Sequence, residues 1–462
     1  MPGRMDIGFN WGRTPEGVPK DDDSPFAILA LAPFRGAGSP PGPLDARPVQ
    51  RVDIETFDGV FSRIAPKIPL GPLGDGGAEL VLSPRSLDDL HPDALLRDVP
   101  ALASLASLLA VAKDPASFPA AAAPAPAPAA ESDAAALSRL LGRAPAPPSA
   151  AESAVDRLVR EAVRPHIVAG PDPRQAEVVA GLTAAVGAAL RVALRRPEYQ
   201  AVEARWRSLR RLVFGLETEG PARAYVLDSS PAEWTDAASL GRAIGRGAAK
   251  EDLPRFDLIL LEASFGLTVA DMSSLSAWGA LAATLGTPIL AGGLPSLVGA
   301  SSVSDLDDPP RWTKAEGPAA DAWAALRHGS DAAHLALALP RVLARAPYGK
   351  LTDPVDTLPF EEVEDDPGDA GFVWSTAAWT CAELAAAGLG ANAAGRVEDV
   401  PFAIFTSKGG RKIQGSTEVL LPDRAAEALL DRGLIPVVAH ASANAIHVPR
   451  MQAIADPGSA LG

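Results

Sequence analysis

The side chains of this sequence that could hold a metal ion are spaced unfavourably for that task. A helical zinc site needs two histidines four residues apart with a glutamate between them, and no pair here has that spacing. Surface or capping roles explain the histidines better, and we predict that the chain has no metal site. The six histidines are His91, His166, His328, His334, His440 and His447.

Nucleophilic catalysis also finds little support in the residue pattern. The single cysteine, Cys381, lies in an apolar helical stretch with no histidine near it in sequence, which is typical of a buried structural cysteine. No G-x-S-x-G nucleophile elbow occurs. One cysteine cannot form an intrachain disulfide, so a reducing compartment is permitted.

Two glycine-containing segments lack the frames that bind phosphate groups. Gly388, Gly390 and Gly395 do not have the dinucleotide-binding spacing, and Ser407–Lys412 (SKGGRK) does not fit the P-loop. We interpret SKGGRK as a turn between two elements and expect no cofactor.

One carboxylate stands where α/β enzymes often carry a catalytic group. Glu262 ends the apolar run Phe256–Glu262, and such strand ends line many active sites. No partner carboxylate, base or metal ligand follows at a suitable spacing, so a buried strand followed by a loop is the better interpretation. An α/β enzyme is therefore only the third hypothesis for this chain.

The elements that must position these residues follow from the apolar pattern. From about residue 221, short apolar runs alternate with helical patterns, which predicts an α/β fold with a mixed, partly parallel sheet flanked by helices. The runs are Ala224–Leu227, Phe256–Leu261, Pro288–Ala291, Phe402–Phe405 and Leu434–Ala439. Residues 151–215 are predicted to be helical, and Tyr199, Trp206 and Leu209 lie on an apolar stripe within them.

The first part of the chain has its own strand and helix signals. Phe26–Leu31 and Glu79–Leu82 are predicted strands, and apolar residues at helical spacing predict a helix over Val52–Ile64. A helix beginning at Pro100 carries leucines at helical spacing. We expect Leu102, Leu105 and Leu109 of this helix to pack the first domain against the second.

These signals divide the chain into four segments. We predict a flexible arm at residues 1–22 and a first domain at 23–112. A Pro/Ala-rich linker is predicted at 113–150, and a second domain at 151–462. Within the second domain the sequence predicts helices at 151–215 and the α/β part at 221–462. A length of 462 residues is ample for two such domains.

The composition excludes some partner classes. The net charge of −15 argues against binding to nucleic acid, which requires clustered lysine and arginine, and against anionic membrane surfaces. No run approaches the ~18 consecutive apolar residues of a membrane span, and no signal peptide is visible at Met1–Lys20. We expect a cytoplasmic protein that is not inserted in a membrane.

Several strings within residues 150–455 resemble, in order, the large subunit of the type VI secretion contractile sheath. Pro197–Leu209 (PEYQAVEARWRSL) looks like that family's H-P-x-[FY]-Q-x-L-E-x-x-W-R-x-L signature, and Leu339–Gly349 (LPRVLARAPYG) like its L-P-R-x-L-x-R-x-P-Y segment. Phe360–Glu362 matches F-x-F-E-E, and Phe372–Ala378 resembles Y-L-W-x-N-A-A with Ser-Thr where Asn is usual. The strings contain four further residues that we expect in interfaces or in the core: Arg341, Arg345, Tyr348 and Trp374.

The first domain resembles the small subunit of the same sheath. Pro25–Leu31 (PFAILAL) looks like its P-F-x-I-x-V-L strand, and Leu87–Asp93 (LDDLHPD) matches its M-D-D-F-x-P-D string. The resemblance implies that both subunits are fused in this chain as a structural, non-enzymatic protomer. It also implies four kinds of partner: copies of itself in a helical or ring assembly, a hexameric tube protein, baseplate components and an AAA+ unfoldase.

The sequence departs from the large-subunit pattern at its end. Large subunits usually continue past the segment matched by Arg450–Gln452 to a strand that pairs with arms of neighbouring protomers, whereas this sequence stops at Gly462. The resemblance makes a sheath protomer that powers ejection of the tube the first hypothesis, whereas the missing strand favours the second. A non-polymerising adaptor or cap at the baseplate or the sheath end is the second.

Overall fold

The fold is known from a computed structural model, which describes most of the chain. The described residues are 24–37, 42–72, 79–115, 117–118, 173–216, 220, 222–249, 254–364, 368, 371–388, 394–407, 410–440, 443–459 and 461. The predicted arm at 1–22, nearly all of the predicted linker at 113–150 and residues 151–172 of the predicted helical segment lie outside them. The domain boundaries drawn from the sequence therefore stay predictions.

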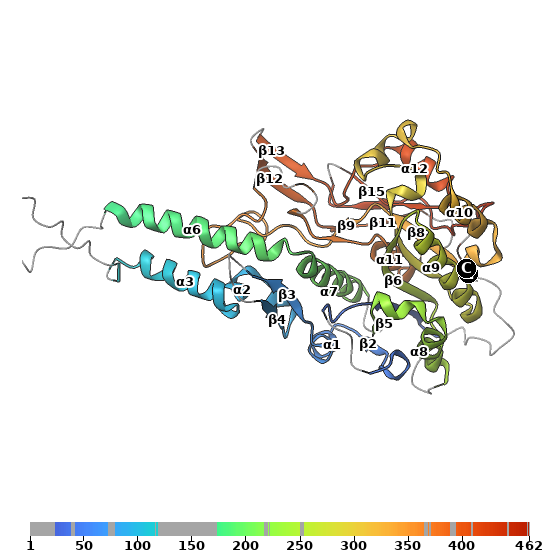
Figure 1. Ribbon diagram of the computed structural model, residues 1–462, viewed down its shortest axis with the longest axis horizontal. Helices are drawn as coiled ribbons and strands as arrows, with labels where there is room; N and C mark the ends of the chain where they lie inside the picture. Colours follow the sequence, from blue (N-terminus) through green and yellow to red (C-terminus); the bar gives the residue numbers. More distant parts are fainter. Residues whose placement is uncertain are drawn as a thin grey trace, which may run out of the picture. The chain divides into compact units, whose positions relative to one another are not determined.

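Among the described residues, a seven-stranded sheet has the spatial order β14-β8-β7-β6-β1-β5-β2. Figure 1 labels β8, β6, β5 and β2 of this sheet. Neighbouring strands are parallel except β2 and β5, which are antiparallel. The predicted α/β class with a mixed sheet is confirmed. The strands are β14 (Ile435–Pro436), β8 (Leu335–Leu339), β7 (Ile289–Gly293), β6 (Leu258–Phe265), β1 (Phe26–Ala32), β5 (Ala222–Asp228) and β2 (Gln50–Val52).

Strand β1 lies inside this sheet, although it comes from the N-terminal part of the chain. Ile28 is paired with Ala224 of β5 on one side and with Leu258 of β6 on the other. All residues of β1 after Phe26 are buried, which is the pattern of a strand that is covered on both faces. Residues from both sides of the predicted linker therefore build one sheet.

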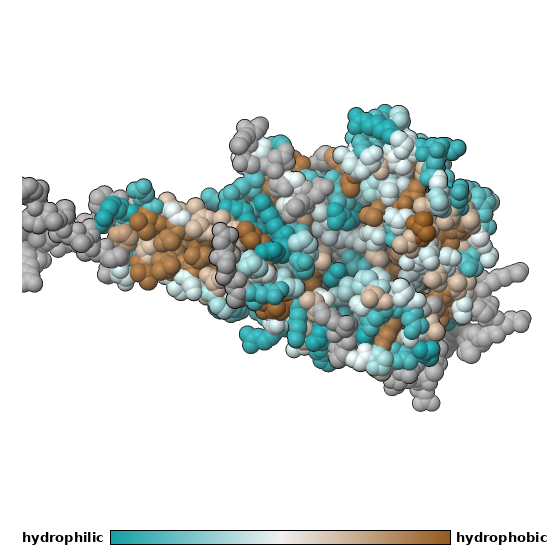
Figure 2. All heavy atoms as spheres, in the orientation of Figure 1, coloured by the Kyte–Doolittle hydropathy of each residue, from teal (hydrophilic) through white to brown (hydrophobic). Residues whose placement is uncertain are grey.

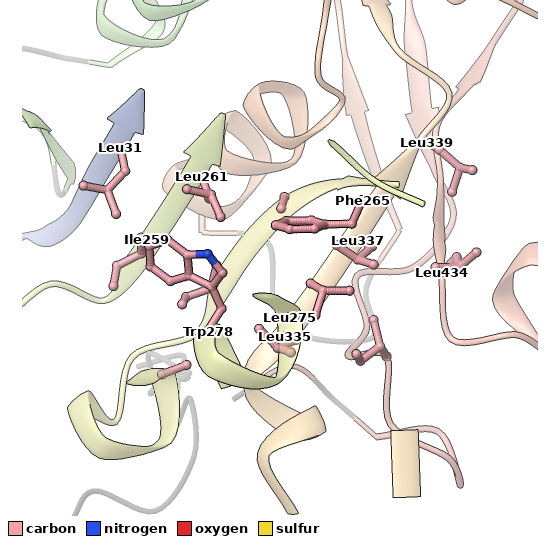
Figure 3. Close-up of a cluster of buried hydrophobic side chains, with 14 of the residues drawn as sticks. Leu31, Ile259, Leu261, Phe265, Leu275, Trp278, Leu335, Leu337, Leu339 and Leu434 are labelled. Carbon is pink, nitrogen blue, oxygen red and sulfur yellow. The ribbon is translucent and has the colours of Figure 1, made fainter. Parts of the chain in front are cut away.

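One face of the sheet packs against four helices and forms the main core. Leu29 and Leu31 of β1 belong to this core together with Ile259 of β6. Figure 3 shows Trp278, from one of the helices, beside Ile259 and the other strand side chains. The helices that contribute to this core are α8 (Ala237–Ala249), α9 (Val269–Leu285), α10 (Pro318–His328) and α12 (Asp423–Leu430).

The opposite face is covered by α7 (Pro197–Gly215) and α11 (Ala378–Ala386), which pack on each other and on strands of the sheet. Ile28 of β1 is buried there because side chains alternate between the two faces of a strand. The predicted apolar stripe of α7 is confirmed, since Tyr199, Trp206 and Leu209 are fully buried. Pro197 at the first helical turn favours a helix start at that position.

Smaller strand pairs complete the described fold. They are β3 (Ile68–Gly71) with β4 (Leu80–Leu82), β9 (Val342–Leu343) with β10 (Trp374–Ser375), β12 (Ala403–Ser407) with β13 (Gly410–Gln414), and β16 (Ile446–Val448) with both β11 (Gly395–Val397) and β15 (Val438–Ala439). The run Phe402–Phe405 thus contributes to a hairpin and not to the main sheet. Ser407 pairs with Gly410, so this segment joins two antiparallel strands, as expected for a turn, and residues 408–409 lie outside the described residues.

The helix predicted over Val52–Ile64 begins five residues later in the structure than the sequence predicted, so the predicted start was wrong. Helix α1 spans Phe57–Ile64, and Val52 ends strand β2, where it is paired with Ala224. Ile54, which the helical spacing assigned to the apolar face, is 42% exposed. The spacing of apolar residues could not reveal this, because the partner strand that holds Val52 extended lies far along the chain.

The chain divides into two compact units, one made of residues 1–95 and 189–462 and the other of residues 96–188. The second unit contains α3 (Pro100–Lys113) and most of α6 (Pro173–Leu194), while α2 (Pro92–Asp98) spans the boundary. Figure 1 shows α3 and α6 side by side, and the Gln175 side chain donates a hydrogen bond to the Ala112 carbonyl at 2.9 Å. Figure 2 shows apolar side chains gathered over α3 and α6. Leu108 of α3 and Val178 of α6 are exposed.

One described helix segment, Arg174–Leu194, is long and apolar enough to cross a membrane, with a mean hydropathy of 1.6. Helices α2 and α3 would pass the same test only as one span, but they meet at a bend of 97°. Length and composition alone do not separate a membrane span from a helix that packs against protein.

Candidate functional site

Helix α7 carries three polar side chains that lie on one side because they are spaced by four residues. Tyr199, Glu203 and Arg207 follow each other at this spacing, which brings side chains of successive helical turns together. Glu203 is fully buried, and it accepts a hydrogen bond from Nε of Arg207 at 2.8 Å. A buried carboxylate of this kind requires further donors to be stable.

Arg345, which follows β9, supplies those donors. Its Nε and Nη2 donate to the two carboxylate oxygens of Glu203 at 2.7 and 3.0 Å. Its Nη1 and Nη2 donate to the carboxylate of Glu362 at 2.6 and 2.9 Å. The guanidinium also lies 4.0 Å from the ring centre of Tyr348. Arg345 is thus held by two paired carboxylates and one aromatic face, an arrangement that suits the planar guanidinium and not an ammonium group.

The cluster is joined to the N-terminal part of the chain through one carbonyl group. The Leu90 carbonyl, at the end of η2 (Leu87–Leu90), accepts hydrogen bonds from the hydroxyl groups of Tyr199 and Tyr348. The Tyr348 hydroxyl also lies 3.1 Å from Glu203 and accepts a hydrogen bond from Arg207 at 2.7 Å. A backbone group of the small-subunit-like segment is therefore bound by side chains of the large-subunit-like segment.

Neighbouring contacts strengthen this attachment. The ring of His91 packs edge-on against Tyr348, with the ring centres 5.0 Å apart. The Asp93 carboxylate accepts hydrogen bonds from the backbone N–H groups of Asp356 and Thr357 at 2.9 and 3.0 Å and from the Thr357 hydroxyl at 2.6 Å. These bonds lower the pKa of Asp93, although its partial burial alone would raise it.

The charges of the cluster balance, because two carboxylates face two guanidiniums. Burial alone would raise the pKa of Glu203, but Arg345 and Arg207 outweigh it and hold that pKa below its ordinary value. Burial and the charge of Glu203 raise the pKa of Tyr348, so its hydroxyl stays protonated and can donate. Glu203 is an ionised acceptor with all its donors in place, which suits a structural role and not a general base.

Other groups considered for chemistry are also engaged. Glu262 accepts hydrogen bonds from the Thr376 hydroxyl, at 2.8 Å, and from the Trp379 indole. Burial raises the pKa of the Cys381 thiol to about 12, so it is not a thiolate at neutral pH. In the ranges that the structure describes, no three His, Cys, Asp or Glu side chains are grouped to hold a metal ion.

The structure brings three of the residues singled out in the sequence into this cluster: Tyr199, Arg345 and Tyr348. Trp206 and Leu209 lie further along α7 in the core, where the Trp206 indole donates to the Phe34 carbonyl at 2.9 Å.

The remaining residues singled out in the sequence lie elsewhere. Arg341 is paired with Glu418, its Nε 2.9 Å from the carboxylate, and Trp374 packs on Phe372 with ring centres 5.7 Å apart. On α3, Leu102 and Leu109 are buried and Leu105 is half-buried. The expectation that these leucines join the two domains stays a prediction.

Three members of the cluster were not singled out as site residues in the sequence: Glu203, Arg207 and Glu362. Each of them lies in a string that carried the family resemblance. The four-residue spacing from Tyr199 to Glu203 and Arg207 was a usable signal for two of them. Nothing in the local sequence connects them to Glu362, because that contact depends on the fold.

Comparisons with known proteins agree with this arrangement. Residues 4–113 match the family model described as "Type VI secretion system, VipA, VC_A0107 or Hcp2", and residues 255–453 match VipB, "EvpB/VC_A0108, tail sheath N-terminal domain". The type VI secretion system sheath protein TssC1 of Pseudomonas aeruginosa is 24% identical, over 63% of this chain and 63% of its own length. The chain thus spans less than two thirds of that curated relative.

Strand β1, helix α7 and the buried charge cluster unite two parts of one chain, and the two family models describe a type VI secretion system protein and a tail sheath domain. The chain belongs to the type VI secretion sheath families. It carries a small-subunit part and, after it, a large-subunit part.

Proposed function

We propose that this chain is a structural protomer of a type VI secretion contractile sheath, in which the small-subunit part and the large-subunit part act as one body. The observation that carries the proposal is the position of β1. This strand of the small-subunit part lies between β5 and β6 and is hydrogen-bonded to both. Separating the parts would remove an inner strand of the sheet, so the two parts cannot work as independent bodies.

The buried cluster supports the same proposal. Glu203 and Glu362 are neutralised by Arg345 and Arg207, and the cluster holds the Tyr199 and Tyr348 hydroxyls at the Leu90 carbonyl. Chemistry of this kind aligns one segment on another and does not leave a reactive group exposed. A role in assembly is therefore better supported than catalysis.

The proposed partners follow from the sheath families. Copies of this chain would form the wall of the sheath, a hexameric tube protein would lie inside it, and baseplate components would nucleate it. An AAA+ unfoldase would dismantle the contracted form. We infer a cytoplasmic location for this assembly.

Electron microscopy of the purified full-length chain tests the proposal. We expect filaments or rings, alone or after co-expression with a candidate tube protein, because a sheath protomer has to bind copies of itself. A discrete particle at every concentration, with or without the tube protein, would contradict self-assembly and favour an adaptor or cap.

A further inference from the structure

An open groove of about 1030 Å³ lies next to the buried cluster, in the first compact unit. The C-terminal end of α7, the segment after Arg345 and the segment that precedes β12 form its walls. Five arginines line the groove: Arg207, Arg210, Arg211, Arg345 and Arg411. Three carboxylates face them: Asp353, Glu383 and Asp399. Arginines outnumber carboxylates in this lining, whereas the chain as a whole has a net charge of −15.

Three of the arginines are already paired within the chain. Arg207 and Arg345 belong to the buried cluster, and Nε of Arg211 lies 3.0 Å from the Glu383 carboxylate. Arg210 and Arg411 are exposed, and within the described residues neither has a carboxylate partner. Arg210 lies over the ring of Phe214, 4.3 Å from its centre. Two guanidiniums are therefore available to carboxylates from outside the chain.

The groove also exposes apolar side chains between these charges. Phe214 is 43% exposed, Phe402 39% and Leu351 74%, and all three line the groove. Arginine and aromatic side chains are the residue types that contribute most to the affinity of protein interfaces. The combination fits a segment that carries both carboxylates and an apolar side chain.

We propose that the groove is an interface between copies of this chain and receives an acidic segment of a second copy through Arg210 and Arg411. Charge complementarity selects this occupant, because the rest of the chain has a large excess of carboxylates over basic side chains. The inference rests on the proposed function, since a sheath protomer has to present surfaces to its own copies. It adds the position of one such surface and its chemistry.

The test is the double variant Arg210→Glu with Arg411→Glu in the full-length chain. Arg432→Glu is the matched control, because Arg432 is also exposed and lies over an aromatic ring, 4.8 Å from the centre of Trp312, but is not part of the groove. Assembly is measured by sedimentation velocity and electron microscopy at low and high salt. We expect the double variant to assemble only at protein concentrations about tenfold higher than the unmodified chain needs, because charge reversal replaces attraction by repulsion. The control should assemble at the same concentrations as the unmodified chain.

A photo-crosslinking residue in place of Leu351 identifies the occupant. We expect a crosslink to an Asp/Glu-containing peptide of a second copy, weakened by salt and by the double variant. If the double variant assembles normally, or if the crosslink stays within one copy or reaches another protein, the groove is not an interface between copies, although the proposed function stands. If the unmodified chain does not assemble under any condition, both proposals fail.

Discussion

Replacing Arg345 by methionine tests whether the buried cluster holds the fold together. The methionine fills part of the space of the arginine but removes four hydrogen bonds of 2.6 to 3.0 Å to two buried carboxylates. Glu203 then keeps Arg207 and the Tyr348 hydroxyl, whereas Glu362 keeps the backbone N–H of Tyr348. A buried charge that loses its partner costs about 3–5 kcal/mol, and we expect the free energy of unfolding to fall by about that amount.

The effect should depend on pH in a defined direction. In the unmodified chain the pKa of Glu203 is lowered, so its stabilising contribution is present above the unfolded value of 4.5 and is lost as the pH falls through the folded value. Without Arg345, only Arg207 opposes the effect of burial, so the pKa of Glu203 in the folded variant is higher than in the unmodified chain, and the resulting penalty is relieved as the pH falls. The difference between the two proteins should therefore be largest at neutral pH and shrink on acidification.

Urea denaturation followed by circular dichroism at about pH 7 and about pH 4 measures both effects. Arg242→Met is the matched control, because Arg242 also pairs with a carboxylate, that of Asp45, but the two side chains are 56% and 25% exposed. We expect a smaller loss for that variant, since solvent screens its charge. An Arg345→Met variant that loses less than about 1 kcal/mol, or that loses equally at both pH values, would refute the reasoning.

Three further predictions concern other parts of the described fold. Trp206→Ala should lower the free energy of unfolding by about 3–5 kcal/mol because Trp206 is fully buried against Phe34 and Phe61; urea denaturation checks this, and Trp206→Phe, which keeps most of the packing, should cost less. Cys381, with its pKa raised to about 12 by burial, should resist a thiol reagent at mildly alkaline pH and react once the chain is denatured; fast labelling of the native chain would disprove its burial. Asp93→Ala should lower the melting temperature at neutral pH by removing the acceptor for three hydrogen bonds. Because the pKa of Asp93 is lowered, that difference should disappear once the pH falls below the folded value, and a difference that persists there would point to another cause.

The family could be predicted from the sequence, because the resemblance depends on short sequence strings that occur in a fixed order. Pro25–Leu31, Leu87–Asp93 and Pro197–Leu209 each resemble a sheath string, and the family models match segments on both sides of the long gap in the described residues. The strings Pro197–Leu209, Leu339–Gly349 and Phe360–Glu362 include the charged and tyrosine residues that meet in the buried cluster. Their types were visible in the sequence, but their contacts with each other were not.

The sequence by itself determined the elements whose signals are local. The stripe through Tyr199, Trp206 and Leu209 predicted α7, and the apolar run after Phe26 predicted β1, because helical and strand periodicities need only neighbouring residues. Tertiary structure decided what those elements touch. Val52 is extended because it pairs with Ala224, and Glu203 is a buried acceptor because Arg345 lies 142 positions away in sequence and 2.7 Å away in space. Pairing across such separations depends on the burial of the whole sheet, and no local pattern of side chains encodes it.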